Sequence, residues 1–244
     1  MKYLKTLTCL FPALLMAEPT ESDYYTITPI RPPEGLHPET SGIDIGPDGA
    51  VYVGTRRGDI YRITNAHPGS GEPVWNLWAQ GLHESLGLAW RDGWLWATQR
   101  AEVTKIKDKD GDGRADIFRA VNDHGGNNGD YHECAFGTRH DREGNIWAVL
   151  CLTGSGGYSS DFRGWCVRVT PDGKMIPTTS GIRSPGGIGF NALGDVFYCD
   201  NQGLWNGSSC VKHLAPGSFQ GNPTGWKAYE QLDENLLGGR PVQP

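Results

Sequence analysis

Among the seven histidines of the sequence, His132 has the best context for moving a proton. It lies in the polar run 127–134, directly before an apolar stretch that is typical of a strand. An imidazole changes charge near neutral pH and can act as a general base, and the neighbouring Asp130 and Glu133 are placed to orient it. A surface-loop histidine without chemistry is the competing interpretation.

Arg183 has the corresponding place before a later strand, in the run 181–190. A guanidinium fork there can bind a carboxylate through two hydrogen bonds. An arginine that caps carbonyl groups at a rim is the alternative. Glu39 and Glu84 stand at the same place before two other strands, and this shared register predicts that they face a common cavity with His132 and Arg183. Asp200 and Asn201 follow the second strand of the last copy, where they can bind a loop, a metal ion or a sugar hydroxyl of the substrate.

The acidic run 108–116 has the spacing of a calcium-binding loop. Carboxylates stand at loop positions 1, 3, 5 and 9, which are Asp108, Asp110, Asp112 and Asp116, and a glycine stands at position 6. An EF-hand-type loop wraps oxygen ligands around Ca²⁺ in this way, with the carbonyl of Arg114 as a further ligand. Position 12 is an arginine instead of the usual glutamate. We expect a structural calcium site, with a solvated acidic turn as the alternative.

A repeated phrase predicts the elements that position these residues. Each copy has a glycine, alternating apolar residues, a tight turn and a second alternating stretch, as a β-hairpin does. The copies start at Gly42, Gly87, Gly137 and Gly187, which are 45, 50 and 50 residues apart. A period of this length with several strands per unit predicts an all-β protein, a β-propeller. Loops that enter the innermost strands then open onto the central cavity.

Four copies are fewer than the six that are common in propeller enzymes. We therefore expect four blades of an incomplete six-bladed propeller, and a self-contained four-bladed propeller is the alternative. The expected boundaries are a signal peptide at 1–17, an N-terminal extension or entry strand at 18–39, blades at 40–221 and an irregular, truncated tail at 222–244.

The first residues predict export. Lys2 and Lys5 precede an apolar stretch at 7–16 that is too short to cross a bilayer, and Ala17 offers a cleavage site. The mature chain is therefore expected to be secreted or periplasmic, without a membrane span. Five cysteines would remain, an odd number that leaves at least one unpaired. Cys134 and Cys151 flank one hairpin-like stretch, but their pairing stays open.

The composition excludes two classes of partner. The 35 glycines and 16 prolines suit many short strands. A formal net charge of −6 gives no attraction to nucleic acid or to an anionic membrane surface.

Several segments resemble soluble dehydrogenases for glucose and sorbosone that depend on pyrroloquinoline quinone (PQQ). Residues 181–190 resemble a segment that binds the quinone, and residues 84–89 and 47–61 resemble blade starts of that family. Residues 131–207 resemble still more closely secreted propeller proteins of planctomycete-type bacteria, which are described as membrane-bound dehydrogenases or haem-binding proteins. The likeness runs over about residues 40–221.

This resemblance implies a periplasmic PQQ-dependent sugar or aldose dehydrogenase with a cytochrome as electron acceptor. His132 would take the proton of the anomeric hydroxyl while a hydride passes to the quinone, and Arg183 would bind the quinone. The asparagine that follows the arginine in that family is Ser184 here, and the later cofactor-binding residues fall in blades that this chain lacks.

Two other classes of function stay open at this point. One is a calcium-dependent hydrolase of the gluconolactonase type, which would use Glu39, Glu84 and Asn201 around its metal. The other is a propeller that binds glycans or proteins without chemistry.

Overall fold

The computed structural model describes residues 18–152, 154, 160, 162–203 and 206–224. Contacts divide the chain into two units, residues 1–30 and 31–244. Within residues 18–39, the described chain has one regular element, the 3-10 turn Glu21–Asp23, which Thr20 caps. The predicted signal peptide, and the predicted tail beyond residue 224, lie outside the described residues. None of the helical segments that are described has the length and apolarity to span a bilayer.

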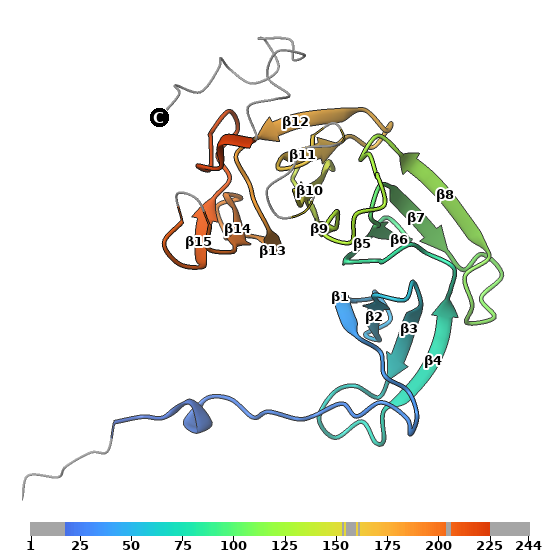
Figure 1. Ribbon diagram of the computed structural model, residues 1–244. Coiled ribbons are helices and arrows are strands. Elements are labelled where there is room, and N and C mark those ends of the chain that lie inside the picture. Colours follow the sequence, from blue (N-terminus) through green and yellow to red (C-terminus); the bar gives the residue numbers. More distant parts are fainter. Residues whose placement is uncertain (1–17, 153, 155–159, 161, 204–205, 225–244) are drawn as a thin grey trace, which may run out of the picture. The chain divides into compact units, whose positions relative to one another are not determined.

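The second unit contains four antiparallel sheets, which we call blades 1 to 4 in chain order (Figure 1). The first three have four strands each and the fourth has three. The strands of blade 1 are β1 (Thr40–Ile45), β2 (Val51–Thr55), β3 (Ile60–Thr64) and β4 (Val74–Ala79); those of blade 2 are β5 (Gly87–Arg91), β6 (Trp94–Thr98), β7 (Val103–Lys107) and β8 (Ile117–Asn122). Blade 3 has β9 (Ala135–His140), β10 (Ile146–Leu150), β11 (Cys166–Val169) and β12 (Met175–Thr179), and blade 4 has β13 (Pro185–Phe190), β14 (Val196–Asp200) and β15 (Cys210–His213). The prediction of an all-β propeller with four blades is confirmed.

The repeat glycine is explained by how closely the first strands of neighbouring blades approach. β1 contacts β5, β5 contacts β9, and β9 contacts β13. A Cβ atom on Gly42 would lie 2.8 Å from the carbonyl carbon of Gly87, and one on Gly87 would lie 1.3 Å from the carbonyl oxygen of Gly137. A side chain at these positions would force the inner strands apart.

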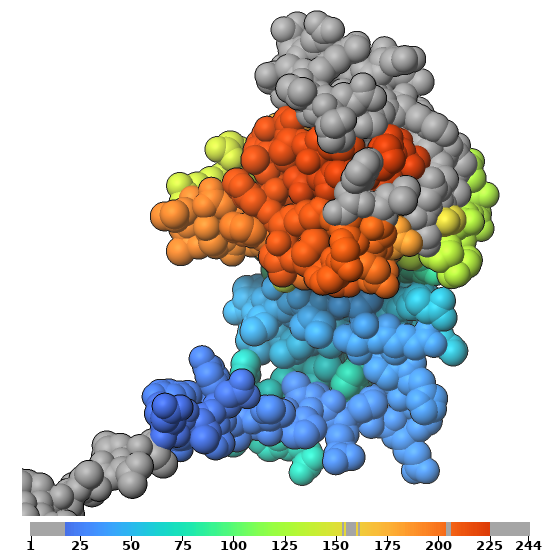
Figure 2. Space-filling model, turned by 60° about the vertical axis from the view of Figure 1, so that its left-hand side comes forward, coloured from blue at the N-terminus to red at the C-terminus, as the bar shows by residue number. Residues whose placement is uncertain are grey.

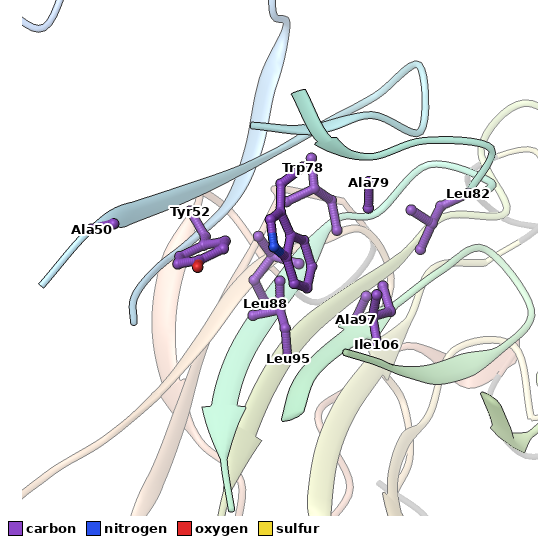
Figure 3. Packing of buried hydrophobic residues seen from close by; sticks show 10 residues of the cluster. Ala50, Tyr52, Trp78, Ala79, Leu82, Leu88, Leu95, Ala97 and Ile106 are labelled. Atoms are coloured by element: carbon purple, nitrogen blue, oxygen red, sulfur yellow. The ribbon is translucent and has the colours of Figure 1, made fainter. Parts of the chain in front are cut away.

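The apolar core fills the space between neighbouring blades. Between blades 1 and 2, the rings of Tyr52 and Trp78 lie next to Leu88 and Leu95, as Figure 3 shows. Both leucines are completely buried, and burying such a side chain stabilises the fold by about 1.5–3 kcal/mol. The alternation in the repeat therefore serves blade-to-blade packing, with one face of each sheet toward the preceding blade and one toward the next.

The antiparallel order sorts the loops to two ends of the sheets. A loop that enters a first strand lies at the same end as the loop between the second and third strands, because the first two strands run in opposite directions. This entrance end carries Glu39, Glu84, His132 and Arg183. The tight turns between first and second strands lie at the opposite end, with the acidic loop between β7 and β8.

Candidate functional site

Glu39 and Glu84 adopt the same local structure before the first strands of their blades. Both have a left-handed backbone, with φ values of 44° and 55°. Each carboxylate binds an arginine from the loop that follows the second strand of its own blade. Arg56 Nε lies 3.1 Å from Glu39 Oε2, and Arg100 Nε lies 2.9 Å from Glu84 Oε2. In both residues Oε2 accepts the arginine bond, so a ligand at that oxygen would compete with the arginine.

Arg100 joins Glu84 to the loop that carries His132. Its guanidinium donates to the carbonyl oxygens of Asp130 and Tyr131, at 2.5 and 3.1 Å. The side chain of Arg100 is 7% exposed and that of Glu84 is 15% exposed. A charge-assisted pair removed from water in this way holds its neighbours firmly, so the backbone before His132 has a defined position.

A second arginine, Arg163, holds the same loop from within. It lies between β10 and β11 and is completely buried. Its guanidinium donates to the carbonyl oxygens of Cys134 (3.1 Å), Arg100 (2.9 Å) and Gly126. Burial lowers the pKa of Arg163, and the nearby Glu133 opposes that shift. The two arginines therefore fix both ends of the segment that contains His132.

Asp130 lies beside His132 and bonds to its main chain. The main-chain N–H of His132 donates to Asp130 Oδ1 at 2.8 Å, and Gly154 donates a further N–H to that oxygen at 3.2 Å. These bonds, the one from His132 first, lower the pKa of Asp130. The imidazole Nδ1 lies 3.4 Å from the same oxygen and makes no hydrogen bond to a described group, and the imidazole is 31% exposed.

The other orienting residue that the sequence suggested, Glu133, is completely buried. Its carboxylate accepts the N–H of Asn128 at 2.6 Å. Glu133 thus shapes the loop from its buried side, while Asp130 bonds to the main chain of His132. The ring centres of Tyr131 and His132 lie 3.7 Å apart, with the two rings tilted, and Tyr131 is 74% exposed.

Asp200 organises the segment that carries Arg183 and Ser184. Its carboxylate is buried and accepts the N–H groups of Ser184 and Asn201, both at 2.9 Å, that of Arg183 at 3.3 Å and the hydroxyl of Tyr198 at 3.0 Å. These donors occupy the carboxylate, which therefore acts as a loop anchor. The exposed Asn201 accepts the Ser209 hydroxyl at 3.2 Å.

Arg183 keeps part of its guanidinium for other partners. Its Nη1 donates to the carbonyl oxygen of Gln202 at 2.5 Å, which is one of five N–H groups on an arginine. Ser184 Oγ lies 3.5 Å from Cys151 Sγ, and Cys151 donates its N–H to the carbonyl of Cys134 at 2.9 Å. A continuous set of contacts thus leads from the His132 loop to Arg183.

The thiols along that set of contacts are free, as are the other three cysteines of the described chain. Burial raises the pKa of Cys151 to about 11 and raises that of Cys134 as well. Both groups are therefore protonated at neutral pH, and neither has the character of a reactive thiolate.

The sequence did not reveal Arg100 and Arg163 as members of this site. Arg100 has a signal that could have found it, because it follows a second strand as Arg56 does and its glutamate precedes the matching first strand. Arg163 has no such signal, since its partners lie in two segments that are 29 to 63 residues before it in the sequence.

The acidic loop forms a separate cluster at the opposite end of blade 2. Ligand oxygens of Asp108, Asp110 and Asp116 lie within 4.8 Å of one another. Ca²⁺ binds oxygen at 2.3–2.6 Å, so ligands on opposite sides of one ion stand at about this separation. Asp112 instead accepts the N–H of Arg114 at 2.8 Å. The loop is tied to blade 1, because Ala115 donates its N–H to the carbonyl of Trp78 at 2.7 Å.

Comparison with known proteins identifies similar folds. A family model described as strictosidine synthase-like, N-terminal, matches residues 27–63. A search of curated proteins found no match. Among solved structures, the PQQ domain of a pyranose dehydrogenase from Coprinopsis cinerea shares 15% identity, with a TM-score of 0.60, over 78% of this chain and 52% of that one.

Two further solved structures belong to the same group of folds. A PQQ-bound aldose sugar dehydrogenase from Streptomyces coelicolor shares 18% identity, with a TM-score of 0.55, over 75% of this chain and 61% of that one. An AA12 carbohydrate-active enzyme from Trichoderma reesei shares 13% identity, with a TM-score of 0.61, over 75% and 55%. The chain thus has the fold of PQQ-dependent sugar dehydrogenases and spans about half to two thirds of their length.

Proposed function

We propose that this chain is the propeller part of a quinone-dependent sugar or aldose dehydrogenase, in which His132 is the general base. The observation that carries this proposal is the fixed histidine. Arg100 and Arg163 hold its loop, the carboxylate of Asp130 lies 3.4 Å from its Nδ1, and the imidazole is 31% exposed. A base with these properties can take the proton of a sugar hydroxyl without reorganising.

The residues present at this end fit an anionic quinone cofactor. Arg183 has N–H groups beyond the one that binds Gln202, and a guanidinium is suited to a carboxylate such as those of PQQ. Ser184 stands beside it. When bound, PQQ supplies a two-electron acceptor for hydride. Two of the solved structures that share this fold are named with PQQ, and this supports PQQ as the cofactor that we propose for this chain.

The remaining expectations belong to the same proposal. They are export to the periplasm or beyond, a cytochrome as electron acceptor, a sugar as substrate and the likeness to planctomycete-type propeller proteins.

The test is reconstitution of the purified chain with PQQ. Cofactor binding is measured by absorbance titration, and aldose-dependent reduction of an artificial electron acceptor measures turnover. We expect His132→Ala to bind PQQ as the unchanged protein does and to lose about 10²–10⁴-fold in turnover.

The matched control is His124→Ala, because His124 lies in the same loop with a side chain that is 72% exposed. It should retain turnover. Equal activity in the His132 variant would remove the histidine from the mechanism. Failure to bind PQQ, or hydrolysis of a lactone that a chelator abolishes, would overturn the dehydrogenase and favour the hydrolase.

We also propose that the cluster of Asp108, Asp110 and Asp116 binds a structural Ca²⁺ ion. Three carboxylates this close repel one another unless a cation joins them. Because the loop is also bonded to Trp78 of blade 1, the ion would strengthen the contact between the first two blades.

A further inference from the structure

A cavity of about 290 Å³ lies between blades 1 and 2, at the end of the sheets that carries the tight turns. The acidic loop between β7 and β8 forms one wall of this cavity with Gly111 and Gly113. The same loop is bonded to blade 1, because Ala115 donates its N–H to the carbonyl of Trp78. The cavity is thus bounded by two blades and lies at the opposite end from the loop of His132.

Three aromatic rings line this cavity and form one cluster. The ring centre of Tyr52 lies 5.2 Å from that of Trp78 and 5.0 Å from that of Trp90. Tyr52 and Trp78 are 4% and 2% exposed and belong to the core that Figure 3 shows, whereas Trp90 is only half-buried. Trp90 therefore offers ring surface to a ligand. The face of an indole ring binds a flat apolar surface, such as the C–H groups on one side of a sugar ring.

Two cations and two carboxylates line the same cavity. On blade 1, Arg62 donates to Asp48 Oδ2 from Nε at 2.9 Å and from Nη2 at 2.6 Å, which uses two of its five N–H groups. These two side chains are 29% and 36% exposed, and blade 1, in blue and cyan in Figure 2, lies at the surface. Blade 2 and its loop supply Lys107 and Asp108. The formal charges of the four residues cancel, so the cavity selects neither an anion nor a cation.

We propose that this cavity binds a neutral sugar, at a site distinct from the one that contains His132. Hydroxyl groups both donate and accept hydrogen bonds, so a sugar matches the carboxylates of Asp48 and Asp108 and the remaining N–H groups of Arg62 and Lys107. An apolar ligand would instead take water away from these charged groups without replacing its hydrogen bonds.

The size of the cavity limits the ligand. A volume of about 290 Å³ is at the lower end of the range for small-molecule sites and suits a single sugar ring. A sugar in this cavity lies at the opposite end of the blades from the proposed general base, so it is held there without being oxidised. The site would therefore anchor a glycan.

The test is the binding of methyl glycosides of glucose, galactose, mannose and xylose, measured by saturation-transfer NMR and calorimetric titration. A methyl glycoside has no free anomeric hydroxyl, so the proposed dehydrogenase reaction cannot consume it. We expect at least one of the four to bind with a dissociation constant in the millimolar range. Absence of binding for all four up to about 100 mM would overturn the proposal.

Variants locate the binding. Trp90→Ala removes the ring surface and should abolish detectable binding. Lys107→Met keeps the stem of the side chain, removes its N–H groups and should weaken binding at least about tenfold. Circular dichroism checks the fold, and Lys107→Met alone decides if Trp90→Ala does not fold.

Two controls complete the experiment. Lys105→Met, two residues earlier on β7 and outside the cavity lining, should bind as the unchanged chain does. His132→Ala should also bind normally. Unchanged binding in Lys107→Met, or loss of binding in His132→Ala, would place the sugar elsewhere and overturn the proposal. Because no turnover is measured, failure of the dehydrogenase proposal would leave this result unaffected.

Discussion

Two glutamate–arginine pairs occupy equivalent positions in successive blades, and they differ in burial. Glu39 and Arg56 have side chains that are 38% and 64% exposed. Glu84 and Arg100 have nearly the same separation but are 15% and 7% exposed. The repeat therefore reproduces the local geometry of the pair, left-handed glutamate included, without reproducing its surroundings.

The difference comes from the loop that covers the second pair. Arg100 donates to the carbonyl groups of Asp130 and Tyr131, so the loop of His132 closes over it. Water solvates the first pair, and such pairs contribute little to stability. For the second pair, loss of Arg100 leaves the mostly buried carboxylate of Glu84 and two carbonyl groups without this partner. The buried pair therefore marks the end of the blade where the loop structure is most constrained.

The largest expected effect is the difference in stability between a variant that lacks Arg100 and one that lacks Arg56. Arg100→Met should lower the free energy of unfolding by about 3 kcal/mol, because Glu84 loses its ion-pair partner in a mostly buried position. Arg56→Met should change it by less than about 1 kcal/mol, because Glu39 can bind water instead. Urea unfolding at neutral pH measures both. Equal losses in the two variants would show that burial does not set the contribution of this pair.

The second prediction concerns the contribution of the acidic loop to stability when Ca²⁺ binds its exposed carboxylates. If Ca²⁺ binds the acidic loop, Ca²⁺ at 100 times its dissociation constant should stabilise the chain by about 2.7 kcal/mol. The double variant Asp108→Asn with Asp116→Asn should lose that effect. Asp172→Asn, at an exposed aspartate in the corresponding turn of blade 3, should keep it. Thermal unfolding with and without chelator is the measurement, and identical curves for the unchanged chain would contradict the site.

The smallest expected effect is the dependence of stability on pH that comes from the buried imidazole of His140. His140 lies edge-on to Trp96 between blades 2 and 3, and burial lowers its pKa. The hydrogen bond to the carbonyl of Gly144 only partly offsets this. The unfolded chain then binds a proton more readily than the folded chain. Stability should fall as pH drops below about 6.5, by at most about 1.4 kcal/mol per pH unit for one group.

A variant that carries the ring found in blade 4 isolates the contribution of His140 to the pH dependence of stability. His140→Phe keeps a ring at the junction, as Phe190 does in the next blade, and removes the titrating group. Its urea midpoints between pH 6.5 and 5 should depend less on pH than those of the unchanged chain. Parallel pH profiles would show that His140 is not responsible.

Much of the fold could be predicted because the repeat records a local requirement. The tight turns and alternating residues define hairpins, and the glycines are demanded by close strand contacts that recur at the same position. Asp130 could be predicted as a partner of His132, because one residue separates them and the side chain of Asp130 bonds to the main chain of His132. The cluster of Asp108, Asp110 and Asp116 also follows from spacing within one loop.

What the sequence determined by itself is thus the set of features that depend on neighbours along the chain: hairpins, repeat register, the acidic loop and the bond from the main chain of His132 to Asp130. Only the tertiary structure decided which charged residues are buried. Arg163 reaches the carbonyl group of Arg100, 63 residues before it, and those of Gly126 and Cys134 in the loop of His132, 37 and 29 residues before it. Glu39 and Glu84 read alike, yet a loop from the next blade covers one of them. The dielectric environment of a charge depends on everything packed around it, and local spacing does not specify that.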